Sequence, residues 1–180
     1  MKSELTNAEY AILGLLMERP CHGYDLDRLI EERGMREWTE LAFSSIYFLL
    51  GKLEKNGLAE SRIDPQKKTR KIYHPTERAR SVFRNATVRA LADPHPLYPA
   101  ILLGLANWAS LDRKTALAAL RRRDDTLAEI SARIAAKAKG APQFLPHINA
   151  LFDYSTSQLQ AERNWLQRTL KLLGDGDGKD

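Results

Sequence analysis

Basic side chains gather on a predicted hairpin in the first half of the chain. Two short runs compatible with strands, residues 59–63 and 71–73, are joined through the turn signal Asp64-Pro65-Gln66. The residues that follow this turn are Lys67, Lys68, Arg70 and Lys71. Clustered Lys and Arg can replace the counterions of a phosphate backbone. The hairpin therefore favours contact with nucleic acid, and the other interpretation is a solvated charged surface.

A short amphipathic helix is predicted directly before this hairpin. Ser44 is the expected N-cap, and Gly57 with Leu58 has the pattern of a helix end closed by a left-handed glycine. The apolar stripe of this helix consists of Ile46, Leu49, Leu50 and Leu53. A helix followed by a basic hairpin is the layout of a winged helix-turn-helix, which lays one helix in a DNA groove.

The outward face of this helix is small, basic and partly aromatic. We expect Ser44, Ser45, Phe48 and Lys52 to touch base edges or flanking phosphates. Tyr47 either contacts phosphate through its hydroxyl or lies half-buried on the preceding helix, and Tyr24 has the same two interpretations. An ordinary surface helix is the alternative for the segment taken alone.

The upstream segment supplies two more helices for this module. The first begins with a capping box of Thr6 and Glu9 and ends before Pro20. Residues 21–23 are expected to form a tight link. The second helix spans about residues 24–33, stops at Gly34, and carries acids that suit a supporting rather than a reading role. The packing positions expected in the hairpin are Ile63, Ile72 and Tyr73.

A proline-rich break at 93–99 is the predicted domain boundary, after a fourth helix that Thr76 caps. We expect a DNA-binding domain at 1–92, a helical domain at 93–174 and a disordered tail at 175–180. The predicted class is mainly α, with a two-stranded wing. A seven-residue spacing, typical of helix-to-helix seams, links Leu145, Phe152, Leu159, Leu166 and Leu173. A homodimer interface explains this seam, and an intramolecular helical hairpin packed on the fourth helix is the alternative.

Composition limits the classes of function. The formal net charge of +5 and the pI near 9.4 permit a polyanionic partner. The single Cys21 excludes an internal disulfide, and no apolar run is long enough for a membrane span, so we expect a cytoplasmic protein. The four histidines are scattered without metal-ligand spacing, and no phosphate-binding glycine loop or nucleophile elbow is present. We expect no enzyme activity, no metal and no cofactor.

Taken together, these motifs resemble the PadR family of bacterial transcriptional regulators. The matching segments are LTNAEYAILGLL at 5–16, HGYDL at 22–26, SIYFLLGKLEKNGL at 45–58, RKIYHPTERAR at 70–80, ALAALRRRDDTLAEI at 116–130 and AERNWL at 161–166. Phe48 stands where the family usually has proline, and its ring is large enough to reach a thymine methyl group. Ala79 stands where the family tends to have glycine, which affects only the start of the fourth helix.

The resemblance implies a homodimeric winged-helix repressor that a small hydrophobic or aromatic effector releases from its DNA operator. Aromatic side chains of the C-terminal half suit such a ligand, although tryptophans in helical domains more often form core. The candidate effector residues are Tyr98, Trp108, Phe152 and Trp165. Two alternatives stay open: a winged helix used for protein–protein contact, and a DNA-binding protein that needs no effector.

Overall fold

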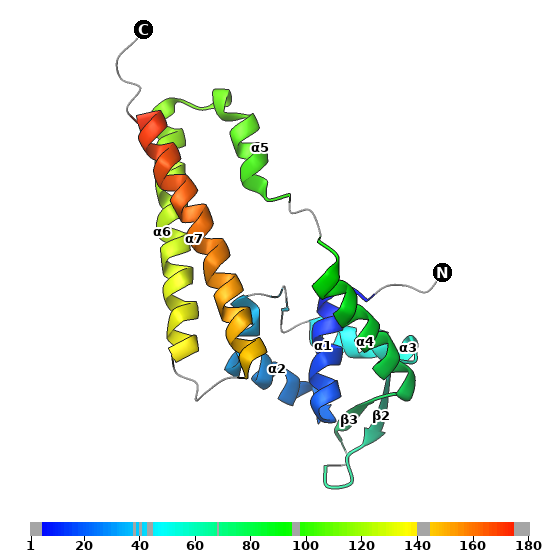
Figure 1. Cartoon of the computed structure of the whole chain (residues 1–180). Helices are drawn as coiled ribbons and strands as arrows, with labels where there is room; N and C mark the ends of the chain where they lie inside the picture. The colour runs from blue at the N-terminus through cyan, green and yellow to red at the C-terminus, as the bar shows by residue number, and fades with distance from the viewer. Residues whose placement is uncertain are drawn as a thin grey trace. The chain divides into compact units, whose positions relative to one another are not determined.

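The computed structural model describes residues 5–37, 39, 41–42, 45–67, 69–94, 98–139 and 145–174. The chain divides into two compact units, Met1–Pro96 and Leu97–Asp180. Both are mainly helical, and the first also holds a small antiparallel sheet (Figure 1). The mainly α class predicted from the sequence is confirmed.

The first unit is a three-helix core with a sheet and a fourth helix. Its elements are α1 (Asn7–Glu18), β1 (Cys21–His22), α2 (Gly23–Glu32), η1 (Met35–Glu37), α3 (Ile46–Lys55), β2 (Ala59–Ile63), β3 (Lys71–Pro75) and α4 (Glu77–Ala92). The predicted capping box starts α1: the backbone N–H of Thr6 donates to Glu9 Oε2 at 2.8 Å, and the backbone N–H of Glu9 donates to Thr6 Oγ1 at 3.2 Å.

The sheet has three strands in the order β1-β3-β2, all antiparallel. Residues 21–23, expected as a link, instead supply the short strand β1, in which Cys21 pairs with Tyr73. Two strands were expected, and the third was missed because a two-residue strand has no hydrophobic periodicity. Its partner β3 extends two residues beyond the predicted run.

The recognition helix α3 ends as its sequence predicts. Gly57 adopts φ +66°, its N–H donates to the carbonyl of Glu54 at 2.8 Å, and the N–H of Leu58 donates to the carbonyl of Leu53 at 2.8 Å. These are the two bonds of a Schellman end. The start differs, because Ser45 precedes the first helical residue and makes no side-chain cap. The predicted cap Ser44 lies outside the described residues.

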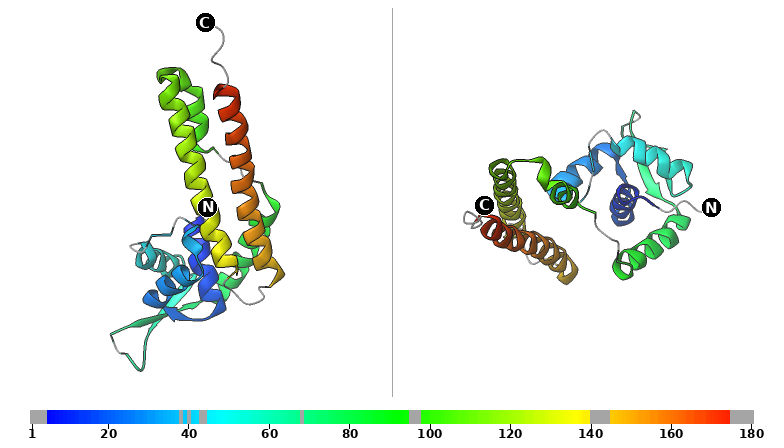
Figure 2. Two further views of the ribbon diagram at one scale, coloured as in Figure 1. Left: turned by 90° about the vertical axis from the view of Figure 1, so that its left-hand side faces the viewer. Right: turned by 90° about the horizontal axis from the view of Figure 1, so that it is seen from above.

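One apolar core holds the first unit together. Ile12, Leu16, Leu26, Leu50 and Leu53 are fully buried in it. They come from α1, α2 and α3, and their helical spacing explains why these three helices fold onto one another. The prediction that Ile63 packs in the core is wrong, because 66% of this residue is exposed. The β2–β3 hairpin projects beyond the helices of its own unit (Figure 2), so its distal end has no core beneath it.

The second unit is built on a pair of long helices. Its elements are α5 (Ala100–Ala106), η3 (Trp108–Ser110), α6 (Arg113–Lys139) and α7 (Pro146–Gly174). In both views of Figure 2, α6 and α7 lie side by side. Two ion pairs join them: Arg123 Nε to Glu162 Oε1 at 2.6 Å, and Arg163 Nε to Asp124 Oδ1 at 2.8 Å.

The proposed dimer seam on α7 is corrected in part. Leu166 is completely buried within the chain, and Leu159 and Leu173 pack against the same cluster with Leu120 and Leu127 of α6. These residues hold the α6–α7 hairpin, which was part of the alternative interpretation. A seven-residue repeat indicates that a stripe is buried, but α6 of the same chain supplies a matching stripe and covers it. Leu145 remains exposed.

Candidate nucleic-acid interface

The outward face of α3 carries aromatic rings next to a bare stretch of backbone. Phe48 is 70% exposed and Tyr47 is 57% exposed. Gly51 and Lys55 are exposed one and two turns further along the same helix. The fold orients this face outward, because the opposite stripe of α3 is in the core.

Two expected DNA-contacting side chains of α3 are engaged inside the chain. Ser45 Oγ donates to the carbonyl oxygen of Ala42 at 2.6 Å. Lys52 Nζ lies 3.3 Å from Oε1 of Glu9, a residue that is only 2% exposed. Burial raises the pKa of Glu9, but the hydrogen bonds with Thr6 and the ammonium of Lys52 outweigh it, so the pKa is lowered overall. Lys52 therefore ties the recognition helix to the first turn of α1.

Tyr47 packs on the second helix, as one of its two interpretations predicted, and it stays exposed enough for the phosphate contact that the other predicted. Its ring lies against Gly23, the first residue of α2, where an added Cβ would come within 2.6 Å of Tyr47 Cε1. The ring thus packs on the second helix while more than half of the residue stays exposed. Tyr24, beside this contact, is 59% exposed. Both tyrosines leave their surfaces open to a partner.

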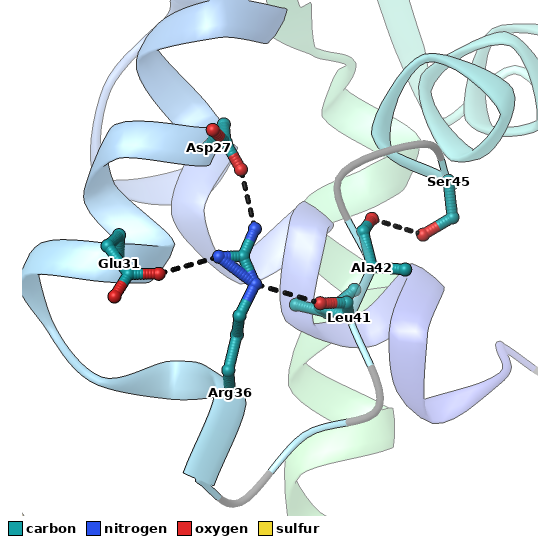
Figure 3. A network of polar contacts seen from close by, with 6 residues as sticks. All are labelled: Asp27, Glu31, Arg36, Leu41, Ala42 and Ser45. Atoms are coloured by element: carbon teal, nitrogen blue, oxygen red, sulfur yellow. Dashed lines mark hydrogen bonds and ion pairs between the residues drawn. The ribbon is translucent and has the colours of Figure 1, made fainter.

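The linker between α2 and α3 is held by one arginine (Figure 3). Arg36 donates from Nε to the carbonyl oxygen of Leu41 at 3.2 Å, from Nη1 to Glu31 at 2.7 Å and from Nη2 to Asp27 at 2.6 Å. The two carboxylates were expected to repel phosphate from α2. Their charge is offset in part by Arg36, which at the same time fixes the chain that leads into α3.

A histidine and an aspartate brace the base of the wing. His22 Nε2 lies 3.2 Å from Asp64 Oδ2, and His22 Nδ1 lies 3.0 Å from the carbonyl oxygen of Lys71. Because β1 and β2 are the two edge strands, this contact joins both edges across β3. The backbone N–H of Gln66, 2.8 Å from Oδ1, is the main cause that holds the pKa of Asp64 below its usual range; the backbone of Lys67 and the His22 imidazole add to it.

Basic side chains lie on the hairpin next to the His22–Asp64 contact. Lys67, Arg70 and Lys71 are exposed, and Lys68 lies outside the described residues. Within the part of the chain that the structure describes, Arg70 and Lys71 have no ion-pair partner. Their positive charge is therefore available to an external anion.

Local sequence patterns did not predict the contacts that brace this surface. Glu9 was assigned only as a cap, and no local pattern indicated its ion pair with Lys52. His22 belonged to a recognisable motif, but its partner Asp64 had been assigned only to a turn. No role was predicted for Arg36. The Glu9–Lys52 and His22–Asp64 contacts join segments that are distant in sequence, so no spacing rule could have found them.

The structure does not bring the four candidate effector residues into one site. Trp108 and Trp165 pack against the α6–α7 cluster, whereas Tyr98 is exposed and Phe152 is half-buried. Trp108 also lines a groove of about 460 Å³ between α5 and α6, together with Ile101, Gly104, Leu105, Leu120 and Arg122. This groove is an apolar hollow of the second unit that could accept a flat molecule.

The single thiol of the chain, that of Cys21, is buried. Burial raises the pKa of the Cys21 thiol to about 11, which keeps it protonated and unsuited to nucleophilic attack at neutral pH. Among the described residues, no three His, Cys, Asp or Glu side chains form a group that could hold a metal ion. No helix in the described ranges is long and apolar enough to cross a membrane.

Known families and structures agree with this architecture. Residues 12–85 match the model of the transcriptional regulator PadR-like family. Bacillus subtilis PadR in complex with operator DNA is 21% identical, with a TM-score of 0.73 over 92% of this chain and 98% of that chain. The same protein in complex with p-coumaric acid is 20% identical, with a TM-score of 0.74 over 92% and 98%. The PadR-like regulator BC1756 from Bacillus cereus is 20% identical, with a TM-score of 0.68 over 95% and 98%.

No curated protein sequence is significantly similar to this chain. At these identities the structural matches show a shared fold, which covers both units. The family is one of transcriptional regulators, so the expectation that the chain is not an enzyme is confirmed. Residues 12–85 are therefore similar to the transcriptional regulator PadR-like family, within a chain that has the fold of PadR along nearly its whole length.

Proposed function

We propose that this protein is a sequence-specific DNA-binding regulator that represses transcription as a homodimer. The observation that carries the proposal is the pairing of an exposed α3 face with exposed Arg70 and Lys71, which have no ion-pair partner among the described residues. A helix of this kind suits the major groove, and basic side chains on an adjacent hairpin suit the flanking phosphates. Bacillus subtilis PadR, whose fold is the same, is a protein that binds operator DNA.

The roles of single residues follow from their exposure. Phe48 and Tyr47 face the groove, and Tyr24 meets the phosphates at its edge. The wing grips the backbone through Lys67, Lys68, Arg70 and Lys71. Ser45 and Lys52 act mainly by fixing the start and the orientation of α3, because their side chains already have partners in the chain. Ser44 is proposed to touch base edges or flanking phosphates.

Two copies of the chain are proposed to associate through the second unit. The short helix α5 has an apolar sequence, yet none of its residues is buried. Leu102 and Leu103 lie outside the groove lining and, like Leu145 directly before α7, are exposed. A second copy of the chain is the partner that would cover these leucines, and a dimer would present two recognition helices to one operator.

The groove between α5 and α6 is the proposed effector site. Trp108 offers an aromatic wall and Arg122 a guanidinium at the same groove, a combination that suits an aromatic carboxylate. Bacillus subtilis PadR has been solved in complex with p-coumaric acid, which is such a molecule. Adding p-coumarate to a protein–DNA complex should release the DNA if the effector class is shared, and an unchanged complex would favour regulation without this effector.

The primary test is the salt dependence of DNA binding. Fluorescence anisotropy with the upstream region of the protein's own gene gives log K against log salt concentration. Each lost phosphate contact reduces the slope by about 0.9, so the double variant R70A/K71A should lower it by about 1.8. The matched control is K137A/K139A, which removes the same charge from the exposed end of α6. No binding at low salt would refute the proposal, and an equal slope change in both variants would remove the wing from the interface.

A further inference from the structure

The hydrogen-bonding side chains of α3 are largely committed to the fold. The hydroxyl of Ser45 donates to the Ala42 carbonyl, and the ammonium of Lys52 faces the buried carboxylate of Glu9. Direct readout of bases usually depends on side chains that donate to or accept from base edges. Apart from the hydroxyl of the exposed Tyr47, the surface left for readout on the first turns of α3 is therefore mainly apolar.

Phe48 is the largest apolar group on this surface. It is 70% exposed, and it takes no part in the core of the first unit. An exposed phenylalanine on a helix contributes little to folding, since it leaves most of its apolar area in water. Its exposure is understandable if another molecule covers it.

Gly51 gives an independent indication of close approach. It lies one turn after Phe48 on the same side of α3, in the interior of the helix. A Cβ added there would meet no atom within 4 Å, so nothing in the described chain requires glycine. Glycine is a poor helix former compared with alanine, which makes a ligand that approaches the bare backbone the simplest physical reason for it.

The two residues together define the chemistry of what they contact. Phe48 provides an apolar surface, and Gly51 beside it has no side chain and faces open space. On the floor of the major groove, the apolar group is the 5-methyl of thymine. We infer that Phe48 and Gly51 read thymine 5-methyl groups, so that operator preference rests on methyl contacts more than on hydrogen bonds; this rests on the proposed function.

Uracil substitution tests the inference directly, because uracil lacks only the 5-methyl group of thymine and keeps the same base pairing. Duplexes selected for binding to the wild-type protein are prepared with thymine replaced by uracil, one position at a time. Loss of one buried methyl contact should weaken wild-type binding about fourfold. The variant F48A should bind thymine DNA more weakly and show no difference between thymine and uracil at the same position. F48L should keep a reduced difference, and it serves where F48A binds too weakly to measure.

Gly51 is tested by G51A, which is expected to weaken binding to the selected duplex while thermal unfolding shows an intact protein. The inference is overturned if no thymine position responds to uracil, or if F48A or F48L keeps the full wild-type difference. Binding of G51A as tight as that of the wild type would also contradict it. A wild-type protein that binds no duplex at low salt refutes the proposed function instead, so the two failures are distinguishable.

Discussion

A methyl group added to either of two glycines of the recognition segment is expected to change stability in opposite directions. Gly57 closes α3 with φ +66°, in the left-handed region, whereas Gly51 lies within the helix. The variants G57A and G51A therefore make the same chemical change a few residues apart, and each serves as the control for the other.

The magnitudes follow from the surroundings of each position. At Gly57 an added Cβ would lie 3.5 Å from Arg78 Nη1, an ordinary contact, so the cost is conformational. An L-residue in the left-handed region costs about 1–2 kcal/mol, and G57A should lose about that much free energy of unfolding. At Gly51 the Cβ meets nothing within 4 Å. G51A should gain about 0.5–1 kcal/mol, because alanine is the better helix former.

Urea denaturation followed by far-UV circular dichroism measures both changes. Slopes for small proteins are about 1–3 kcal/mol per molar urea, so the two midpoints should separate by roughly one molar. An unfolding free energy of G57A equal to or above that of G51A would refute the reasoning. It would mean either that Gly57 does not hold the left-handed conformation or that the Schellman end contributes nothing to the fold.

Three further results are expected. L166A should lose about 2–5 kcal/mol of stability in the second unit, measured by chemical denaturation, whereas L172A at an exposed site of α7 should change little. E9Q should be less stable than the wild type by about 1 kcal/mol at neutral pH. Because the pKa of Glu9 is lowered from 4.5, that difference is complete above 4.5 and disappears as the pH falls through the lower folded value, as unfolding at several pH values will reveal. D64N should loosen the brace to His22, with faster amide hydrogen exchange in β3 and weaker DNA binding; unchanged exchange would show that this contact does not hold the wing.

Most elements of the first unit could be predicted because their signals are local. The Thr6–Glu9 capping box, the glycine end at Gly57 and the leucine stripe of α3 all involve residues within a turn or two of one another. Local patterns failed where the outcome depended on a distant surface. Ile63 is exposed because the wing extends past the core, and β1 forms because β3 is present to pair with it.

The seven-residue repeat on α7 shows the same limit of local patterns. Its period correctly indicates that Leu166 is buried and that Leu159 and Leu173 pack beside it, but period does not name the covering helix. Leu166 is covered by α6 of the same chain, so most of the stripe serves the hairpin, and the proposed contact between copies moves to α5 and Leu145.

By itself, the sequence determined where most of the helices lie and which face of each is apolar, because backbone capping and side-chain periodicity act over a few residues. Only the tertiary structure decided which polar groups remain available to a partner. It brought Glu9 to Lys52 and His22 to Asp64. Charged groups are stabilised by partners at distances of a few ångströms, and those distances are set by packing between segments that are far apart in the chain.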